Sequence, residues 1–304
     1  MKAAVYTKTA SGKVLEIREL AEPVPKDKEV LIRVRAASIN PLDWRMKSHR
    51  PGVDVAGEVV ALGRTVTPFK PGDAVFGTCR GAFAEYACAS QDRVVPKPEG
   101  VSFEQAAAVP VAGLTALQGL RDKGHLQQGQ KVLINGAAGG IGTFAVQIAR
   151  SLGADVTGVC STNNVELVRS LGAGRIIDYT RSDFTQDNER YDLLLDNVGN
   201  RTLSEMRRVL GPNGRCAMAG APKDLRAVLM RVLKAFAWSP FLKQKFTFFI
   251  AKMKRDDLMT LSSLIGVRTV TPVIDRCYPL NEAAAAIAYV EGGHARAKVV
   301  ITLP

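Results

Sequence analysis

The sequence predicts an α/β protein with two domains, and two observations support this prediction. Residues 2 to about 98 contain short alternating or apolar runs separated by Gly, Pro and Asp, which is typical of a small barrel or rolled sheet. From Ser102 onward, apolar runs alternate with helical patterns, which is typical of a parallel, doubly wound sheet. At 304 residues the chain is long enough for both domains to have their own cores.

The order of the elements follows from local patterns. The stretch PLDWRMKSHRPGVD predicts one helical turn after Pro41 and then a loop, and Ser102 is expected to cap a helix. Pro110 and Gly113 are expected to divide the following stretch into two short helices. Later expected elements are helices 164–171 and 201–209, strands 175–178, 192–196 and 214–219, an amphipathic helix in LRAVLMRVLKAF, a strand in FTFFIAK, and a helix in DDLMTLSSLI. The chain is expected to end as strand TVTPVID, helix NEAAAAIAYVEGG and strand AKVVITL, which returns it to the first domain.

Composition excludes several classes of protein. Five scattered cysteines, without a C-x-x-C pair, indicate neither a disulfide framework nor a zinc ribbon, and favour a reducing, cytoplasmic setting. The N-terminus lacks an apolar core long enough for a signal peptide, and no later run predicts a membrane-spanning helix. The net charge of +12 is concentrated, because residues 201–255 hold 13 basic and two acidic residues.

The most informative stretch runs from Lys131 to Cys160 and predicts a strand, a glycine turn, a helix and a second strand. In the turn AAGGIG, Gly139 would let backbone N–H groups approach a pyrophosphate, and Gly142 would let the helix pack closely. Ala138, Gly140 and Ile141 complete this turn. The match is A-x-G-x-x-G, and its flanking strand and helix make a dinucleotide site the favoured interpretation over a turn without a ligand.

The cofactor is chosen at the end of the second strand, where an NAD site would place Asp or Glu on the ribose diol. This chain instead has Ser161, Thr162 and Asn163, which leave space and donors for a 2′-phosphate and no carboxylate to repel it. The pattern therefore favours NADPH. The same residues also suit a helix cap, which is compatible with phosphate binding.

Motifs along nearly the whole chain resemble the medium-chain dehydrogenase/reductase superfamily, in its zinc-free quinone oxidoreductase and enoyl reductase-like branch. These motifs are NPLDW, GVDVAGEVVALG, FKPGDAVFG, GAFAEYA, AAAVPVAGLTALQGL, VLINGAAGGIGTFAVQIAR, GAGRIIDY, YDLLLDNVG and HARAKVVITL. The resemblance implies a GroES-like β-barrel domain, residues 1–112 and 255–304, and a Rossmann domain, residues 113–254, with the cofactor cleft between them. It also implies a homodimer joined through FTFFIAK.

The resemblance also bears on zinc. Zinc-dependent relatives carry a catalytic Cys after the third barrel strand and a Gly-His-Glu further on, where this chain has Asn40 and, in GVD, Asp54. The lobe with four cysteines is missing, and His49, His125 and His294 have no partners at ligand spacing, so no zinc is expected. Of these histidines only His49 is expected near the cleft.

Without a metal, the acceptor must itself spread the developing negative charge, which suits quinones and α,β-unsaturated carbonyls. In the family, the Asn of N-P-x-D faces the nicotinamide, so Asn40 is the first candidate for orienting cofactor or substrate. Asp43 is a candidate for proton transfer or for fixing its own loop, and Trp44 for stacking on a substrate or for packing.

Further cofactor residues are carried over from the resemblance: Thr115, Tyr179, Asn197, Val198, Gly199, Ala219 and Gly220. Many relatives have a Lys near Asn163, so here Arg169, Arg175 or Arg181 would have to supply charge for a phosphate. The loop SHRPGVD is shorter than the relatives' loop at this place, which would open one wall of the substrate pocket.

The basic, aromatic segment 222–255 has three competing interpretations: a lid or subunit interface, a membrane-surface contact, and, least favoured, a nucleic-acid patch. The leading function is an NADPH-dependent reductase of quinones or enones. The alternative is an NADPH-binding sensor or interaction protein that uses this segment for membrane or nucleic-acid contact.

Overall fold

The computed structural model describes residues 1–9, 12–45, 48–220, 243–293 and 295–304. The chain divides into two compact units. The first unit is Met1–Leu114 with Lys252–Pro304, and the second is Thr115–Ala251. These bounds lie close to the division expected from the sequence. Within the described ranges, no helix is long and apolar enough to cross a membrane.

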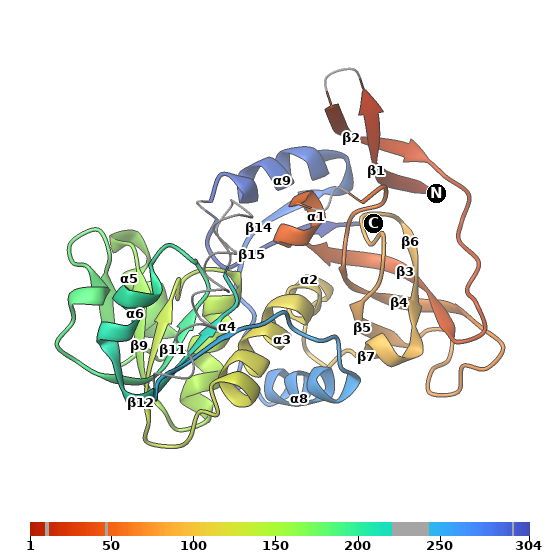
Figure 1. The fold of residues 1–304 in the computed structure, drawn as a ribbon. Helices are drawn as coiled ribbons and strands as arrows, with labels where there is room; N and C mark the ends of the chain where they lie inside the picture. Colours follow the sequence, from red (N-terminus) through yellow and green to blue (C-terminus); the bar gives the residue numbers. More distant parts are fainter. Residues whose placement is uncertain (10–11, 46–47, 221–242, 294) are drawn as a thin grey trace. The chain divides into compact units, whose positions relative to one another are not determined.

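The first unit is built on a seven-stranded sheet with the order β14-β15-β3-β4-β5-β7, in which β6 also pairs with β3 (Figure 1). The strands are β3 (Glu29–Ser38), β4 (Asp54–Leu62), β5 (Ala74–Thr78), β6 (Tyr86–Ser90), β7 (Val94–Pro96), β14 (Ile274–Pro279) and β15 (Lys298–Thr302). A separate hairpin pairs β1 (Lys2–Thr9) with β2 (Gly12–Glu19). Since β15 pairs antiparallel with β3, the predicted return of the C-terminal strand to the first domain is confirmed.

The helices of the first unit are α1 (Pro41–Arg45), α2 (Phe103–Ala107), α8 (Arg255–Gly266) and α9 (Ala283–Glu291), while α3 (Pro110–Gln118) begins in the first unit and ends in the second. Ser102 caps α2 as predicted, within a capping box in which Gln105 returns the bond. The predicted break at Gly113 is wrong, because Gly113 lies inside α3. A Cβ there would come 3.1 Å from Leu261 Cδ1, so the glycine serves close packing against α8.

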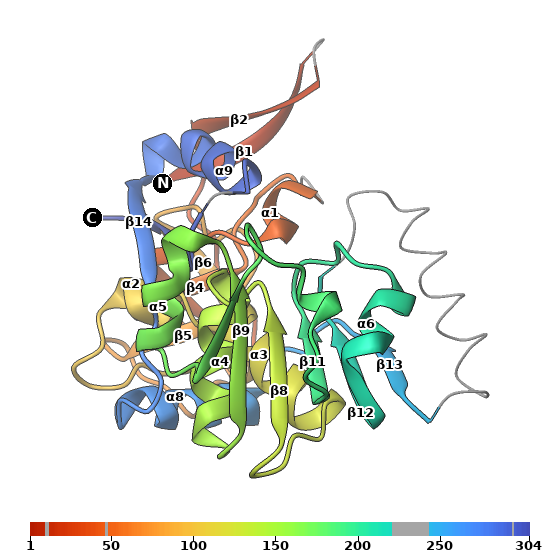
Figure 2. The ribbon, with the colours of Figure 1, turned by 90° about the vertical axis from the view of Figure 1, so that its left-hand side faces the viewer.

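The described residues of the second unit form a six-stranded parallel sheet with the order β10-β9-β8-β11-β12-β13. Figure 2 shows β9, β8, β11 and β12 side by side. The strands are β8 (Lys131–Asn135), β9 (Asp155–Cys160), β10 (Arg175–Asp178), β11 (Tyr191–Asp196), β12 (Leu210–Met218) and β13 (Lys245–Phe248). The order reverses at β8, which lies between β9 and β11, and so creates a topological switch point.

Helices α4 (Gly140–Ser151), α5 (Val165–Ser170) and α6 (Leu203–Val209) connect these strands, after a π-helical turn at Gly119–Lys123. Elements predicted in this unit are present, with shifted bounds: β12 begins at Leu210 rather than 214, and β13 covers only the first part of FTFFIAK. The predicted helix LRAVLMRVLKAF lies outside the described residues. The α/β fold, with a β-rich first unit and a Rossmann-like parallel sheet in the second, agrees with the prediction.

Candidate functional site

The cofactor residues predicted in the second unit gather at one edge of its parallel sheet. The glycine turn follows β8, Ser161 to Asn163 follow β9, and Tyr179 follows β10. Asn197 to Gly199 follow β11, and Ala219 with Gly220 follow β12. Because neighbouring parallel strands end at the same edge, these segments lie beside the switch point, where ligands of open α/β sheets bind.

The glycine turn has the geometry of a phosphate cradle. Gly136 adopts the left-handed conformation, with φ +79°, and Gly139 precedes the first residue of α4. A Cβ on Gly139 would meet only Gly136 O, at 3.4 Å, so the surface above it is open. A Cβ on Gly142 would lie 2.1 Å from Gly136 O, so only glycine fits there. The first amides of α4 have no partner within the helix and bear partial positive charge.

The loop after β11 is organised by a buried carboxylate. Asp196 Oδ1 accepts hydrogen bonds from Asn135 Nδ2 at 2.9 Å and from the backbone N–H of Gly199 at 3.0 Å. Asp196 O accepts the N–H of Gly220 at 2.9 Å. Both polar atoms of the Asn197 amide are buried, and the residues that the structure describes offer them no hydrogen-bond partner. Since buried amides are normally bonded, Asn197 fits a site that a polar ligand completes.

The segment after β9 differs from the expectation in one respect. Thr162 Oγ1 donates to Asp178 Oδ2 at 2.6 Å, so a carboxylate does lie beside Ser161 to Asn163. It comes from the end of the neighbouring strand β10, where Asp178 pairs in register with Cys160. Tyr179, directly after it, is exposed.

The first unit contains a buried polar cluster around Asn40, Asp54 and Lys298. Lys298 Nζ donates to Asn40 Oδ1 at 2.8 Å and lies 3.6 Å from Asp54 Oδ2. Asn40 Nδ2 donates to Asp54 Oδ2 at 2.8 Å, and Ser38 Oγ donates to the same oxygen at 2.6 Å. An ammonium only donates and a carboxylate only accepts, so these partners fix the orientation of the Asn40 amide.

Burial shifts the pKa values of two residues in this cluster, Asp54 and Lys298. Burial raises the pKa of the Asp54 carboxyl, and the nearby Lys298 ammonium opposes the rise. Burial lowers the pKa of Lys298, and the carboxylates oppose the fall. Both side chains are almost inaccessible, with exposures of 4% for Lys298 and 0% for Asp54.

Asp43 holds the loop between α1 and β4. Its Oδ2 accepts the N–H of Asn40 at 2.7 Å and its Oδ1 accepts the N–H of Gly52 at 2.9 Å. Burial raises the pKa of Asp43 to about 7, although these two bonds act in the opposite direction. The geometry is that of the loop-fixing role, and the group also retains a proton near neutral pH.

The remaining predicted residues are more scattered. Trp44 is half-buried and packs on the core of the first unit, while Thr115 is buried in the second. His49 is exposed, and its Nδ1 lies 3.3 Å from Tyr6 O. Among the residues that the structure describes, no group of three or more His, Cys, Asp or Glu is placed to hold a metal ion. His294 and residues 222–242 of the basic segment lie outside the described residues.

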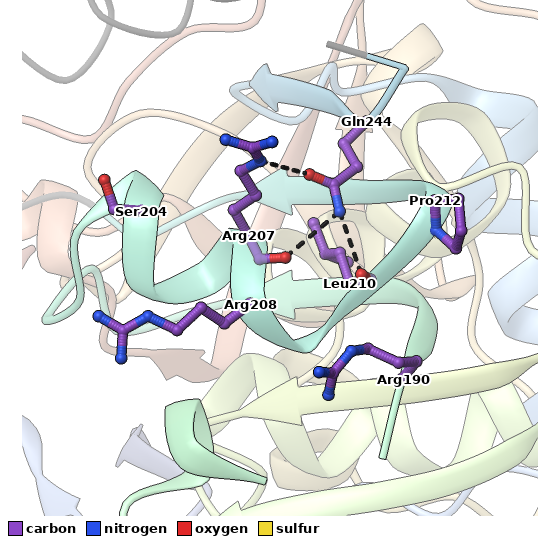
Figure 3. A pocket seen from close by; sticks show the side chains of 7 residues that line it. All are labelled: Arg190, Ser204, Arg207, Arg208, Leu210, Pro212 and Gln244. Carbon is purple, nitrogen blue, oxygen red and sulfur yellow. Dashed lines mark hydrogen bonds between the residues drawn. The ribbon is translucent and has the colours of Figure 1, made fainter. Parts of the chain in front are cut away.

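A hollow of about 510 Å³ lies at the amino ends of β11 and β12 and on α6 (Figure 3). Its lining residues are Arg190, Ser204, Arg207, Arg208, Leu210, Pro212 and Gln244. Gln244 braces it, accepting from Arg207 Nε at 3.2 Å and donating to Leu210 O at 3.0 Å. This hollow is at the opposite edge of the sheet from the glycine turn.

Several residues of these sites escaped the sequence prediction: Ser38, Asn135, Asp178, Asp196 and Lys298. Lys298 gives the one available signal, since it directly precedes the apolar run Val299–Ile301 of the closing strand, where a buried ammonium requires a partner. Asn135 and Asp196 each end an apolar strand just before a turn. Nothing local identifies their partners, because Lys298 and Asn40 are 258 residues apart in sequence.

A glycine turn at a switch point, in a chain with a second, β-rich unit, is the arrangement typical of nicotinamide-dependent dehydrogenases. Two family models match: the alcohol dehydrogenase GroES-like domain over residues 26–99 and the zinc-binding dehydrogenase model over residues 171–301. The chain belongs to the medium-chain dehydrogenase/reductase superfamily, and its relatives include quinone oxidoreductases.

Individual relatives support this assignment. The chain is 32% identical to a chloroplast envelope quinone oxidoreductase homolog of Arabidopsis thaliana, over 99% of this chain and 98% of that protein. It is 31% identical to a chloroplastic NADPH-dependent alkenal/one oxidoreductase of the same plant, over 99% of this chain and 79% of that protein. The solved quinone oxidoreductase of Coxiella burnetii is 29% identical, with a TM-score of 0.86, and covers 100% of this chain and 99% of its own.

Proposed function

We propose that this protein is a zinc-independent, NADPH-dependent oxidoreductase that transfers hydride to a quinone or an α,β-unsaturated carbonyl. The observation that carries the proposal is the glycine turn at the switch point, together with the unpartnered amide of Asn197 at the next strand end. The printed names of the relatives, quinone oxidoreductase and alkenal/one oxidoreductase, support the acceptor class.

The residues present fit a dinucleotide. The open surface over Gly139 admits the pyrophosphate, and the free amides at the start of α4 donate to it. Asn197 contributes an amide donor and an amide acceptor beside the switch point. When bound, the reduced nicotinamide supplies the hydride.

The polar cluster of the first unit does not fit a divalent cation. Asn40 and Asp54, the two positions that match zinc ligands of relatives, are bonded to each other and to the Lys298 ammonium. A metal ion bound to Asp54 would face this buried positive charge at close range. We therefore propose that Lys298 supplies the cluster's positive charge and fixes the amide of Asn40, which is itself only 2% exposed and so organises the loop after β3 from within.

The test is oxidation of NADPH by the purified full chain with a panel of quinones, enones and aldehydes, followed by absorbance. Turnover with quinones or enones, but not with simple aldehydes, is expected, because only the conjugated acceptors spread the negative charge. A protein that binds NADPH but oxidises it with no member of the panel would refute the proposal. Stoichiometric zinc in protein prepared without added metal would refute its zinc-independent part.

We also propose a cytoplasmic homodimer. In the described part of the second unit, β13 is the end strand of the sheet, so pairing with a second copy would extend the sheet across the dimer. Sedimentation at micromolar concentration is expected to give twice the chain mass, and a persistent monomer would contradict this. The role of segment 222–255 in membrane or nucleic-acid contact stays a prediction.

A further inference from the structure

The three arginines that the sequence offered as partners for a 2′-phosphate are separated by the structure. Arg169 lies on α5 and pairs with Glu166 one turn away. Arg175 begins β10, at the opposite end from the glycine-turn edge, and its guanidinium is held by both oxygens of Asp187 at 2.5 and 3.0 Å. Arg181 alone of the three follows the carboxyl end of β10, where the cofactor residues gather.

Asp178 ties the ends of β9 and β10 together. Its Oδ2 accepts from Thr162 Oγ1 at 2.6 Å, and its Oδ1 accepts from the backbone N–H of Thr180 at 2.9 Å and from Thr180 Oγ1 at 2.8 Å. Asp178 O accepts the N–H of Arg181 at 3.0 Å. These bonds fix the loop after β10 against the loop after β9, which holds Ser161 to Asn163.

The same bonds determine how many hydrogen-bond donors and acceptors Thr162, Asp178 and Arg181 retain for a ligand. The Thr162 hydroxyl proton is directed to Asp178, so Thr162 is a poor donor to a phosphate. The Asp178 carboxylate is occupied by three donors and is only 14% exposed, so it is a poor acceptor for a ribose diol. Arg181 Nε lies 3.6 Å from Asp178 Oδ2, while its side chain is 76% exposed, so most of its five donors face outward.

We propose that Arg181 is the residue with which this chain selects the 2′-phosphate of NADPH, and that Asp178 positions Arg181 and the Thr162 loop for it. The guanidinium offsets the carboxylate, so an anion at this strand end meets a planar cation rather than a net negative charge. The inference rests on the proposed function, because it assumes that NADPH is the cofactor.

The test measures binding rather than turnover. Dissociation constants of NADPH and NADH are determined by fluorescence for the wild type and for Arg181→Gln, and those of 2′,5′-ADP and 5′-AMP by competition. The variant is expected to lose about 10- to 100-fold in affinity for NADPH and 2′,5′-ADP. Affinity for NADH and 5′-AMP should change less than about twofold. Arg169→Gln, which removes a nearby exposed arginine, is the matched control and should change none of the four dissociation constants.

Two further measurements separate the possible failures. A wild type that binds NADH more tightly than NADPH would refute the NADPH proposal itself. A wild type that prefers NADPH, with the same preference in Arg181→Gln, would refute only the inference. The wild-type preference should also shrink as salt rises, because the contact is exposed, whereas that of Arg181→Gln should change little.

Asp178→Ala tests the positioning role. If Asp178 positions Arg181, the variant loses affinity for NADPH selectively, although a negative charge has been removed. If Asp178 merely repels phosphate, affinity for NADPH rises, and an equal loss for both cofactors indicates a structural role only. Either of these two results would overturn the positioning role.

Discussion

Replacing Lys298 by Met is expected to destabilise the first unit strongly. The change keeps the length of the side chain but removes the charge that faces Asp54 at 3.6 Å and the donor to Asn40 Oδ1. With both side chains almost fully buried, the remaining carboxylate is left without a counter-charge. Breaking such a pair from one side costs about 3–5 kcal/mol, which is a large part of a typical stability.

The assay is equilibrium urea unfolding followed by the fluorescence of Trp44, which packs on the core of the first unit, in a Trp238→Phe background. Asp54→Asn and the double variant complete a double-mutant cycle. The losses of unfolding free energy in the two single variants, added together, should exceed the loss in the double variant by roughly 2 kcal/mol, a value in the range measured for contacting residues. The reason is that the double variant buries no unpaired charge. The loss of unfolding free energy in Lys298→Met should also be smaller at pH 5 than at pH 8, because Asp54, whose pKa is raised by burial, is more readily protonated at pH 5.

Two results would refute this reasoning. A loss below about 1 kcal/mol in Lys298→Met would mean that Asp54 is well solvated or otherwise compensated. Additive losses in the double variant would mean that the two groups do not interact. Lys298→Arg keeps the charge and is the conservative control, with a smaller loss expected.

Two further predictions concern Asp43 and the glycine turn. Because burial raises the pKa of Asp43 to about 7, the folded protein retains a proton between about pH 4 and pH 7 that the unfolded chain releases, so this group's contribution to stability falls as pH rises through that window. Asp43→Asn should remove this part of the slope of the urea midpoint against pH, and an unchanged slope would contradict the assignment. Gly142→Ala should destabilise the second unit by roughly 1–3 kcal/mol, because its Cβ would lie 2.1 Å from Gly136 O. Gly139→Ala should fold normally, because its Cβ would lie at an ordinary van der Waals distance of 3.4 Å from Gly136 O, but it should bind NADPH more weakly. Equal stabilities of the two variants in thermal unfolding would contradict the packing argument.

The order of the elements was predictable because it depends on local patterns. Apolar runs, capping residues such as Ser102, and the glycine turn act within a few residues of sequence, so they can be found without tertiary information. Gly113 shows where this fails. Its low helix propensity predicted a break, yet close approach to Leu261 from α8 favours a helix with glycine at that position. The partner that decides the outcome lies far away in sequence.

The carboxylates show the same limit at the candidate site. The absence of Asp or Glu after β9 suggested a strand end free of negative charge, but the parallel register of β9 and β10 brings Asp178 to Thr162. Whether an acidic residue there can accept hydrogen bonds from a ligand depends on how many donors its carboxylate already binds. Thr162 and Thr180 donate three hydrogen bonds to Asp178. Their bonds lower the pKa of Asp178, so it stays ionised and retains Arg181 at neutral pH. On the proposal for Arg181, cofactor selection depends on the residue that this carboxylate holds in place, so an acidic residue at this strand end does not by itself predict NAD.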